Sequence, residues 1–285
     1  MALIELKDFS YRYPVSEDFA LKNITLSIEK GEFVAIIGPN GSGKTTLCNA
    51  IRGFVPLFYK GDSFGEVIVD GENIKDASLG GLAVKIGYIF QNPFNQISYV
   101  KDTVFDEIAF GLENLGIEPK MIKDRTARII ERLGIGYLKE KNPFEISGGQ
   151  QQRVALASIL VMEPEILVID EPTSQLDPQG TEQVFEIINL IKEEGKTVIL
   201  VEHKIDLLAR YADKVVVMND GRIVMYGDAK QVLADERLND YGVRMPSYAR
   251  LGHKLQKSFH VNEIPITEEE AEGLILTILK DGEQR

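Results

Sequence analysis

The chain has 285 residues, of which 44% are hydrophobic and 27% are charged. This length and composition are typical of a folded protein with one large or two modest domains, and they exclude a disordered or collagen-like chain. Lysine and arginine total 32 against 44 aspartate and glutamate residues, so the net charge of −12 argues against a protein that wraps nucleic acid. The single Cys48 excludes an internal disulfide, and no apolar run approaches the roughly 20 residues that span a bilayer.

Strand patterns dominate the first ninety residues. The continuous apolar run Phe33–Ile37 predicts a buried strand, followed by a glycine-rich loop and a helix. Alternating or short apolar segments predict further strands at Leu3–Phe9, Leu21–Ile28, Gly65–Val69 and Lys85–Phe90. From about residue 92 to 146 the apolar spacing changes to three and four, which predicts a helical insert.

Helices and strands alternate in the second half of the chain. The expected elements are helix 148–162, strand Ile166–Asp170, helix 178–194, strand Thr197–Val201, a short helix, and strands Val215–Met218 and Arg222–Tyr226. This alternation predicts an α/β fold with a largely parallel sheet. Residues 240–285 form a weaker pattern that ends in a helix from near Thr267, which fits a capping box with Glu270.

The strongest local motif is the segment Gly38–Thr45, which lies between a predicted buried strand and a helix. It matches the phosphate-binding loop, whose backbone N–H groups surround nucleotide phosphates. We expect Lys44 to reach the β and γ oxygens and the Thr45 hydroxyl to bind Mg²⁺; the alternative is an ordinary flexible turn. The expected nucleotide-binding residues here are Gly38, Asn40, Gly41, Ser42, Gly43, Lys44, Thr45 and Thr46.

Two further motifs contain groups suited to phosphate chemistry. The strand that ends at Asp170 places Asp170 and Glu171 on opposite sides, so Asp170 suits the Mg²⁺ shell and Glu171 suits activation of water; a solvated strand end is the alternative. Ser147 can cap a helix, and Gly148 and Gly149 would let a phosphate approach the positively polarised start of that helix. The alternative is an ordinary helix start with the same residues. Since one nucleotide has one triphosphate, two phosphate-directed motifs indicate two ligands or two facing chains.

Together these motifs resemble the ATP-binding cassette (ABC) ATPases over roughly residues 3–235. The segments that carry the resemblance are Gly38–Thr45 (Walker A), Gln91 (Q-loop), Ser147–Gln150 (signature), Asp170 with Glu171 (Walker B), Ser174–Asp177 (D-loop) and His203 (switch histidine). The resemblance implies a P-loop NTPase core with an N-terminal antiparallel subdomain, a helical subdomain at about 92–146 and a small C-terminal extension. It places the ATPase domain at residues 1–239 and the extension at residues 240–285.

The resemblance also implies roles for individual residues. ATP would lie between the phosphate loop of one chain and Ser147, Gly148, Gly149 and Gln150 of another, in a head-to-tail dimer. The implied catalytic residues are Lys44, Gln91, Glu171 and His203, and the implied Mg²⁺ ligands are Thr45, Gln91 and Asp170. Tyr13 takes the position of the aromatic residue that stacks on adenine, with Tyr11 as the fallback. Gln175 and Glu202 depart from the family pattern, and either could alter communication between the two sites.

A narrower resemblance indicates transport. Segments Asn92–Gln96 and Thr103–Asn114 are similar to the ATPases of energy-coupling factor (ECF) transporters, which import vitamins or transition-metal ions. This implies a second ATPase chain, identical or related, and an integral membrane subunit received by the Gln91 loop and residues 94–145, with the chain at the cytoplasmic face of the membrane. No nucleic acid partner is expected.

Two other functions remain as alternatives. An ABC-type ATPase that acts on DNA or ribosomes is disfavoured because the helical insert lacks the sustained heptads of a coiled coil and the chain holds one cassette. A nucleotide kinase or GTPase would leave the signature and His203 unused. The apolar stripe of the final helix, formed by Leu274, Ile275, Ile278 and Leu279, must pack either on its own cassette or on a partner ATPase.

Overall fold

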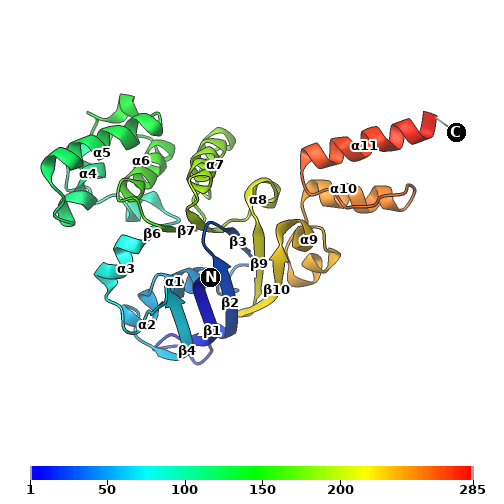
Figure 1. The fold of residues 1–285 in the computed structure, drawn as a ribbon, viewed down its shortest axis with the longest axis horizontal. Coiled ribbons are helices and arrows are strands. Elements are labelled where there is room, and N and C mark those ends of the chain that lie inside the picture. Colours follow the sequence, from blue (N-terminus) through cyan, green and yellow to red (C-terminus); the bar gives the residue numbers. More distant parts are fainter. Residues whose placement is uncertain (1, 284–285) are drawn as a thin grey trace.

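The computed structural model describes residues 2–283. Its central sheet consists of β3 (Phe33–Ile37), β6 (Ile86–Ile89), β7 (Ile166–Asp170), β8 (Thr197–Val201), β9 (Lys214–Asn219) and β10 (Arg222–Asp228). The order is β10-β9-β3-β8-β7-β6, and all neighbours run parallel except β9 and β10 (Figure 1). Strands β3, β7 and β8 are buried at every position, as expected for parallel strands covered on both faces.

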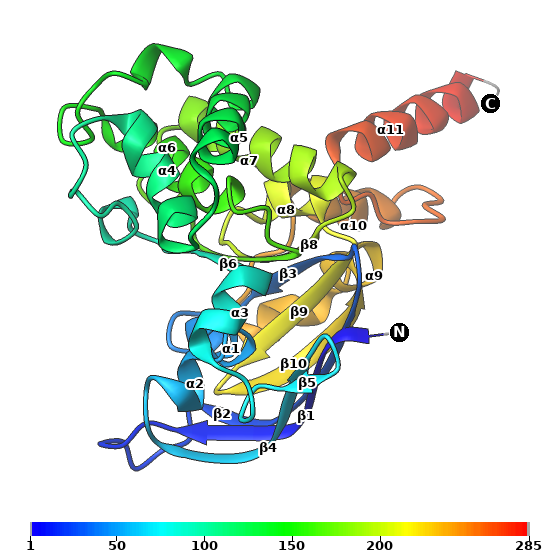
Figure 2. The same cartoon turned by 60° about the vertical axis from the view of Figure 1, so that its left-hand side comes forward.

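A second, antiparallel sheet lies at one end of the molecule (Figure 2). It contains β1 (Ala2–Arg12), β2 (Leu21–Glu29), β4 (Asp62–Val69) and β5 (Glu72–Asn73), in the order β2-β1-β4-β5. Buried and exposed residues alternate along most of β2, so one face of this sheet is buried. The buried residues pack with α1 (Lys44–Ile51) and one face of β3 in a common core. This core also holds Cys48, and burial raises the pKa of the Cys48 thiol well above its ordinary value.

Helices cover the central sheet and form a separate lobe. Outside that lobe and the C-terminal extension, the helices are α1, α2 (Phe54–Leu57), α3 (Leu79–Lys85), α7 (Pro178–Glu193), α8 (Ile205–Tyr211) and α9 (Ala229–Leu233). The lobe contains α4 (Val104–Asn114), α5 (Pro119–Arg132) and α6 (Gly148–Leu160), with short 3₁₀ turns at Pro93–Asn95 and Gly136–Leu138. The buried face of α4, with Val104, Ile108 and Leu112, follows the predicted spacing of three and four. The fold class is therefore confirmed, including the antiparallel sheet and the helical insert.

The C-terminal extension contains one helix that was not predicted. After a 3₁₀ turn at Glu236–Tyr241, α10 (Ser247–Gln256) packs beside α11 (Glu268–Glu283), which projects away from the rest of the chain (Figure 1). Ser247 donates hydrogen bonds from its N–H and its hydroxyl to the carboxylate of Asp206 on α8, and Ala249 belongs to the main hydrophobic core. The extension is thus anchored to the cassette through α10. Among the helices described between residues 2 and 283, none is both long and apolar enough to cross a membrane.

The predicted start of the last helix is correct within one residue, but its capping box is incomplete. Thr267 Oγ1 accepts a hydrogen bond from the N–H of Glu270, as predicted. The Glu270 carboxylate, however, accepts from the N–H of Ile266 instead of that of Thr267. Lys230 lies 3.1 Å from the same carboxylate, so it also links this helix start to α9.

Candidate functional site

The phosphate-binding motif forms a tight loop between β3 and α1. Gly38 and Gly43 have φ angles of 151° and 101°, which side-chain-bearing residues rarely adopt. A Cβ atom on Gly38 would lie 2.2 Å from the carbonyl oxygen of Met218, and one on Gly43 would lie 2.8 Å from that of Ala20. Glycine is therefore required at both positions by backbone conformation and by close packing.

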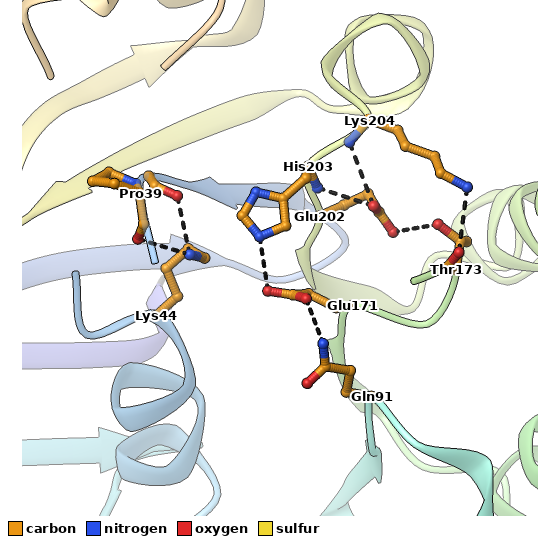
Figure 3. Close-up of polar contacts among 9 residues, drawn as sticks. Pro39, Lys44, Gln91, Glu171, Thr173, Glu202, His203 and Lys204 are labelled. Carbon is orange, nitrogen blue, oxygen red and sulfur yellow. Dashed lines mark hydrogen bonds and ion pairs between the residues drawn. The ribbon is translucent and has the colours of Figure 1, made fainter. Parts of the chain in front are cut away.

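Lys44 points back into this loop (Figure 3). Its Nζ donates to the carbonyl oxygens of Gly38 and Pro39 over 3.0 and 3.1 Å, and the side chain is buried. Burial lowers the pKa of the Lys44 ammonium, while the nearby carboxylates of Glu171 and Asp170 act in the opposite direction. A positive charge is thus held inside the loop, where phosphate oxygens can replace the two carbonyl groups.

A hollow of about 410 Å³ opens beside the loop. Six of the eight nucleotide-binding residues predicted between Gly38 and Thr46 line it. The full lining consists of Ala20, Asn40, Gly41, Gly43, Lys44, Thr45, Thr46, Gln91 and Glu171. Ala20, the residue before β2, was not predicted, because a lone alanine before a strand carries no chemical signal. The size and polarity of the hollow suit a phosphate chain.

Glu171 is the centre of a polar cluster at the edge of the hollow. Its Oε2 accepts a hydrogen bond of 2.7 Å from Gln91 Nε2, and its Oε1 lies 2.9 Å from His203 Nε2 (Figure 3). The φ angle of Glu171 is 47°, a strained conformation that costs on the order of 1–3 kcal/mol and is typical of functional sites. Three residues from separate parts of the chain, Gln91, Glu171 and His203, are therefore brought together.

Asp170 is buried one residue before Glu171 and faces the start of α1. The Thr45 hydroxyl donates a hydrogen bond to its carboxylate, and the Tyr88 hydroxyl lies 3.4 Å from Oδ2. Burial raises the pKa of Asp170, although the bond from Thr45 opposes this shift. The Asp170 carboxylate, the Thr45 hydroxyl and the amide oxygen of Gln91 are hard oxygen donors of the kind that Mg²⁺ prefers, so these residues fit the predicted ion.

The signature segment lies outside this hollow in the single chain. Ser147 Oγ accepts from the N–H of Gln150, and Gln150 Oε1 accepts from the N–H of Ser147, so Ser147 and Gln150 form a complete capping box at the start of α6. Ser147 and Gly148 are exposed, and Gly149 is half-buried. The glycine-rich helix start is therefore accessible to a second molecule.

The two tyrosines proposed for adenine differ in accessibility. Tyr11 is fully buried, its hydroxyl donates to the carbonyl of Tyr59, and burial raises its pKa to about 12. Tyr13 is only half-buried, and its hydroxyl lies 3.3 Å from Thr46 Oγ1, beside the hollow. Tyr13 is therefore the better-placed residue for contact with a base.

An aromatic group close to the Gln91 loop was not predicted. Tyr99 stacks on Phe144 with ring centroids 4.3 Å apart, and the ring centroid of Phe94 lies 6.4 Å from that of Tyr99. Phe94 and Phe144 are both more than half exposed. We call Phe94, Tyr99 and Phe144 the aromatic stack. The sequence shows the three residues but not their proximity, because Phe144 joins the others only through the fold of the helical lobe.

Comparison with known proteins identifies the family. Residues 21–174, more than half of the chain, match the ABC transporter family model. The energy-coupling factor transporter ATP-binding protein EcfA2 of Clostridium perfringens is 39% identical over 273 residues, which cover 93% of each chain. The corresponding protein EcfA of Methanosphaera stadtmanae is 36% identical over 283 residues, covering 97% of this chain and 99% of its own.

Solved structures agree with this match. CbiO1 of Clostridium perfringens, described as part of the ABC transporter complex CbiONQ, has a TM-score of 0.74 and 34% identity, with 90% of this chain and 99% of its own covered. A dimeric ATP-binding cassette in a post-hydrolysis state with ADP and Pi has a TM-score of 0.69 and 30% identity over 79% of this chain and 98% of its own. On its fold, its motifs and these similarities, the chain belongs to the ATP-binding proteins of ABC transporters, with ECF-type ATP-binding proteins among its relatives.

Proposed function

We propose that the chain binds and hydrolyses ATP with Mg²⁺ and thereby energises a membrane importer of a micronutrient, a vitamin or a transition-metal ion. The observation that carries the proposal is the convergence of Lys44, Thr45, Gln91 and Glu171 on one hollow, with His203 in contact with Glu171. The ATPase role is also supported by the relative with bound ADP and Pi, and the import role by the names of the ECF relatives.

Each residue has a distinct task in this proposal. Lys44 and the N–H groups of the loop bind the phosphates, and Tyr13 contacts the adenine. Thr45, Asp170 and Gln91 hold Mg²⁺, which when bound supplies positive charge to the phosphate oxygens. Glu171 accepts a proton from the attacking water, and Gln91 orients its carboxylate. His203 donates a hydrogen bond to the γ-phosphate as negative charge develops there.

The exposed signature would complete the site of a second ATPase chain. We propose that Ser147, Gly148, Gly149 and Gln150 contact the γ-phosphate bound by the partner, which is a second copy or a related chain. The exposed helix start of α6, with Gly148 and Gly149 in its first turn, offers a positive dipole end to an anion. The dimeric state of the relative with ADP and Pi supports this arrangement.

Ser147→Arg should prevent the ATP-dependent dimer of a hydrolysis-deficient chain. The arginine side chain would fill the space that a partner's phosphate needs, while Ser147 itself is exposed and supports only the cap of its own helix. Size-exclusion chromatography with light scattering, on Glu171→Gln with and without Ser147→Arg in MgATP, measures the effect. Glu145→Arg, an exposed change two residues earlier, is the control. A dimer that persists in Ser147→Arg would remove the signature from the interface.

The C-terminal extension would provide a second contact between the ATPase chains. The side chains of Ile275, Leu276 and Leu279 on α11 are 40–59% exposed, although Ala271 on the same helix is buried. Exposed apolar stripes of this kind mark interaction surfaces. We propose that α11 packs on the partner ATPase and holds the two chains together when ATP does not bridge them.

The aromatic stack would receive the integral membrane subunit at the cytoplasmic face of the membrane. Phe94 and Tyr99 of this stack follow Gln91 closely in the sequence, and Gln91 Nε2 donates to Glu171 Oε2. Contact with a partner at the stack can therefore reach the Glu171 carboxylate through Gln91. CbiO1, described as part of the complex CbiONQ, supports assembly with other subunits.

Charge placed in the aromatic stack should release the chain from membranes. Phe144 is 66% exposed, so Phe144→Glu leaves the core intact but puts a carboxylate where an apolar partner surface would pack. Membrane fractionation of cells that express the chain, followed by co-purification, measures retention and the identity of the bound subunit. Phe64→Glu, at a phenylalanine on β4 that is 59% exposed, is the matched control. Membrane retention equal to wild type in Phe144→Glu and in Phe94→Glu would favour a role outside transport.

A further inference from the structure

Glu202, between β8 and His203, has a buried carboxylate that the proposed mechanism does not use. The residue is only 2% exposed. Its Oε1 accepts from the backbone N–H of His203 over 2.9 Å and of Lys204 over 3.4 Å, and its Oε2 accepts from Thr173 Oγ1 over 2.7 Å. A buried carboxylate is costly unless hydrogen bonds compensate it, so these contacts define where the side chain must lie.

These contacts connect two loops that emerge from neighbouring parallel strands (Figure 3). Thr173 follows Glu171 by two residues in the loop after β7, whereas Glu202 and His203 follow β8. Lys204 strengthens the connection, because its Nζ donates to the carbonyl of Thr173 and to the hydroxyl of Thr181 on α7. The backbone adds one more bond, from the N–H of Glu171 to the carbonyl of Val201.

The linked loops carry the two side chains that meet at the site. His203 Nε2 and Glu171 Oε1 are 2.9 Å apart, and this distance depends on how the two loops are held relative to each other. Displacement of a catalytic group by about 1 Å can cost a hundredfold in rate. Glu202 binds the backbone of His203 on one side and the Thr173 hydroxyl on the other, so it fixes the histidine loop against the Glu171 loop.

We propose that Glu202 is a positioning residue, which acts through Thr173 and the His203 backbone to hold the His203 ring at the Glu171 carboxylate. The proposal rests on the roles assigned above to Glu171 and His203. A carboxylate suits this role because its two oxygen atoms can accept hydrogen bonds from both loops at once: Oε1 from the backbone of His203 and Oε2 from Thr173.

The first test follows the His203 ring directly by NMR of the full-length chain. The sequence has three histidines, so the His203→Ala spectrum assigns the signal. In Glu171→Ala the ring loses its carboxylate partner, and this spectrum provides the reference for a released ring. We expect Glu202→Ala to move the His203 signal toward that reference, and Glu202→Gln, which keeps one acceptor oxygen, to move it less.

The matched control is Glu107, another buried carboxylate that joins two segments. It lies on α4 of the helical lobe, is 3% exposed, and accepts from the N–H and the hydroxyl of Ser98 over 2.6 and 2.9 Å. Both Glu107→Ala and Glu202→Ala should lower the melting temperature, because each leaves buried donors without an acceptor, but Glu107→Ala should leave the His203 signal in place. A His203 signal that is unchanged in folded Glu202→Ala would overturn the proposal.

ATP turnover gives a second, independent test. Glu202→Ala should lower kcat by about ten- to a hundredfold, with KM for ATP changed less than about threefold. Thr173→Val should have the same effect. Thr173→Ser keeps the hydroxyl and should therefore turn over at nearly the wild-type rate. In a His203→Ala background, Glu202→Ala should cause no further loss, because residues that act through one another are not additive. An equal loss in both backgrounds contradicts the proposal. If His203→Ala alone turns over like wild type, the assigned role of His203 fails instead, and the NMR result still decides the position of the ring.

Discussion

Glu171→Gln is expected to lower the steady-state rate of ATP hydrolysis by about 10²–10⁴-fold while ATP affinity stays within a few-fold of wild type. Glutamine has nearly the same shape, and its amide oxygen can still accept the hydrogen bond from Gln91 Nε2. It cannot accept a proton from water at neutral pH. Binding depends on Lys44 and the loop N–H groups, which the substitution does not change.

The measurements for Glu171→Gln are phosphate release at saturating MgATP and equilibrium binding of ATP, both on the full-length chain with its partner subunits. Glu165→Gln is the control. Glu165 precedes the first residue of β7, whereas Glu171 follows the last, and Glu165 forms an ion pair with Lys30 instead of lining the hollow. Turnover of Glu171→Gln equal to wild type would assign the base elsewhere. A large loss of ATP affinity would show that Glu171 serves binding instead of the chemical step.

Most of the fold could be predicted because its central strands are continuous apolar runs. Phe33–Ile37, Ile166–Asp170 and Thr197–Val201 were predicted with the bounds that the structure has. Helix α10 was missed for the opposite reason. Its buried residues are the small Ala249 and Gly252, which contribute no strong apolar periodicity, and it directly follows a proline.

Residues of the candidate site could be predicted from the sequence where they belong to short local motifs. Gly38–Thr45 and the acids Asp170 and Glu171 are each recognisable within a few residues, and the structure places them at one edge of the sheet. The bridge from Glu202 to Thr173 is different, because it exists only where β7 and β8 are neighbours in register. The aromatic stack likewise requires the folded helical lobe. Sequence patterns indicate chemistry, but contacts between loops depend on strand order.

The second large effect is expected at α11. Leu276→Lys together with Leu279→Lys should weaken the nucleotide-free dimer by about 3 kcal/mol, roughly a hundredfold in Kd, if this helix pairs with the partner ATPase. Both side chains are at least half exposed in the single chain, so the substitutions leave its own core unchanged. Like charges on two facing helices would add repulsion.

Point substitutions are preferable to truncation of the extension. Removal of all residues after Tyr241 would also delete Val243, Met245 and Ala249, which belong to the main core, so a lost dimer could reflect unfolding. Light scattering of the nucleotide-free chain after size-exclusion chromatography, at matched concentrations, measures pairing. Glu272→Lys with Thr277→Lys is the control, because both positions are exposed and polar on the same helix. ATP binding by each monomer should persist in both double variants. If the Leu276 and Leu279 variant pairs as tightly as this control, α11 does not contact the partner ATPase, and the two chains must be held together by the ATP-bound site alone.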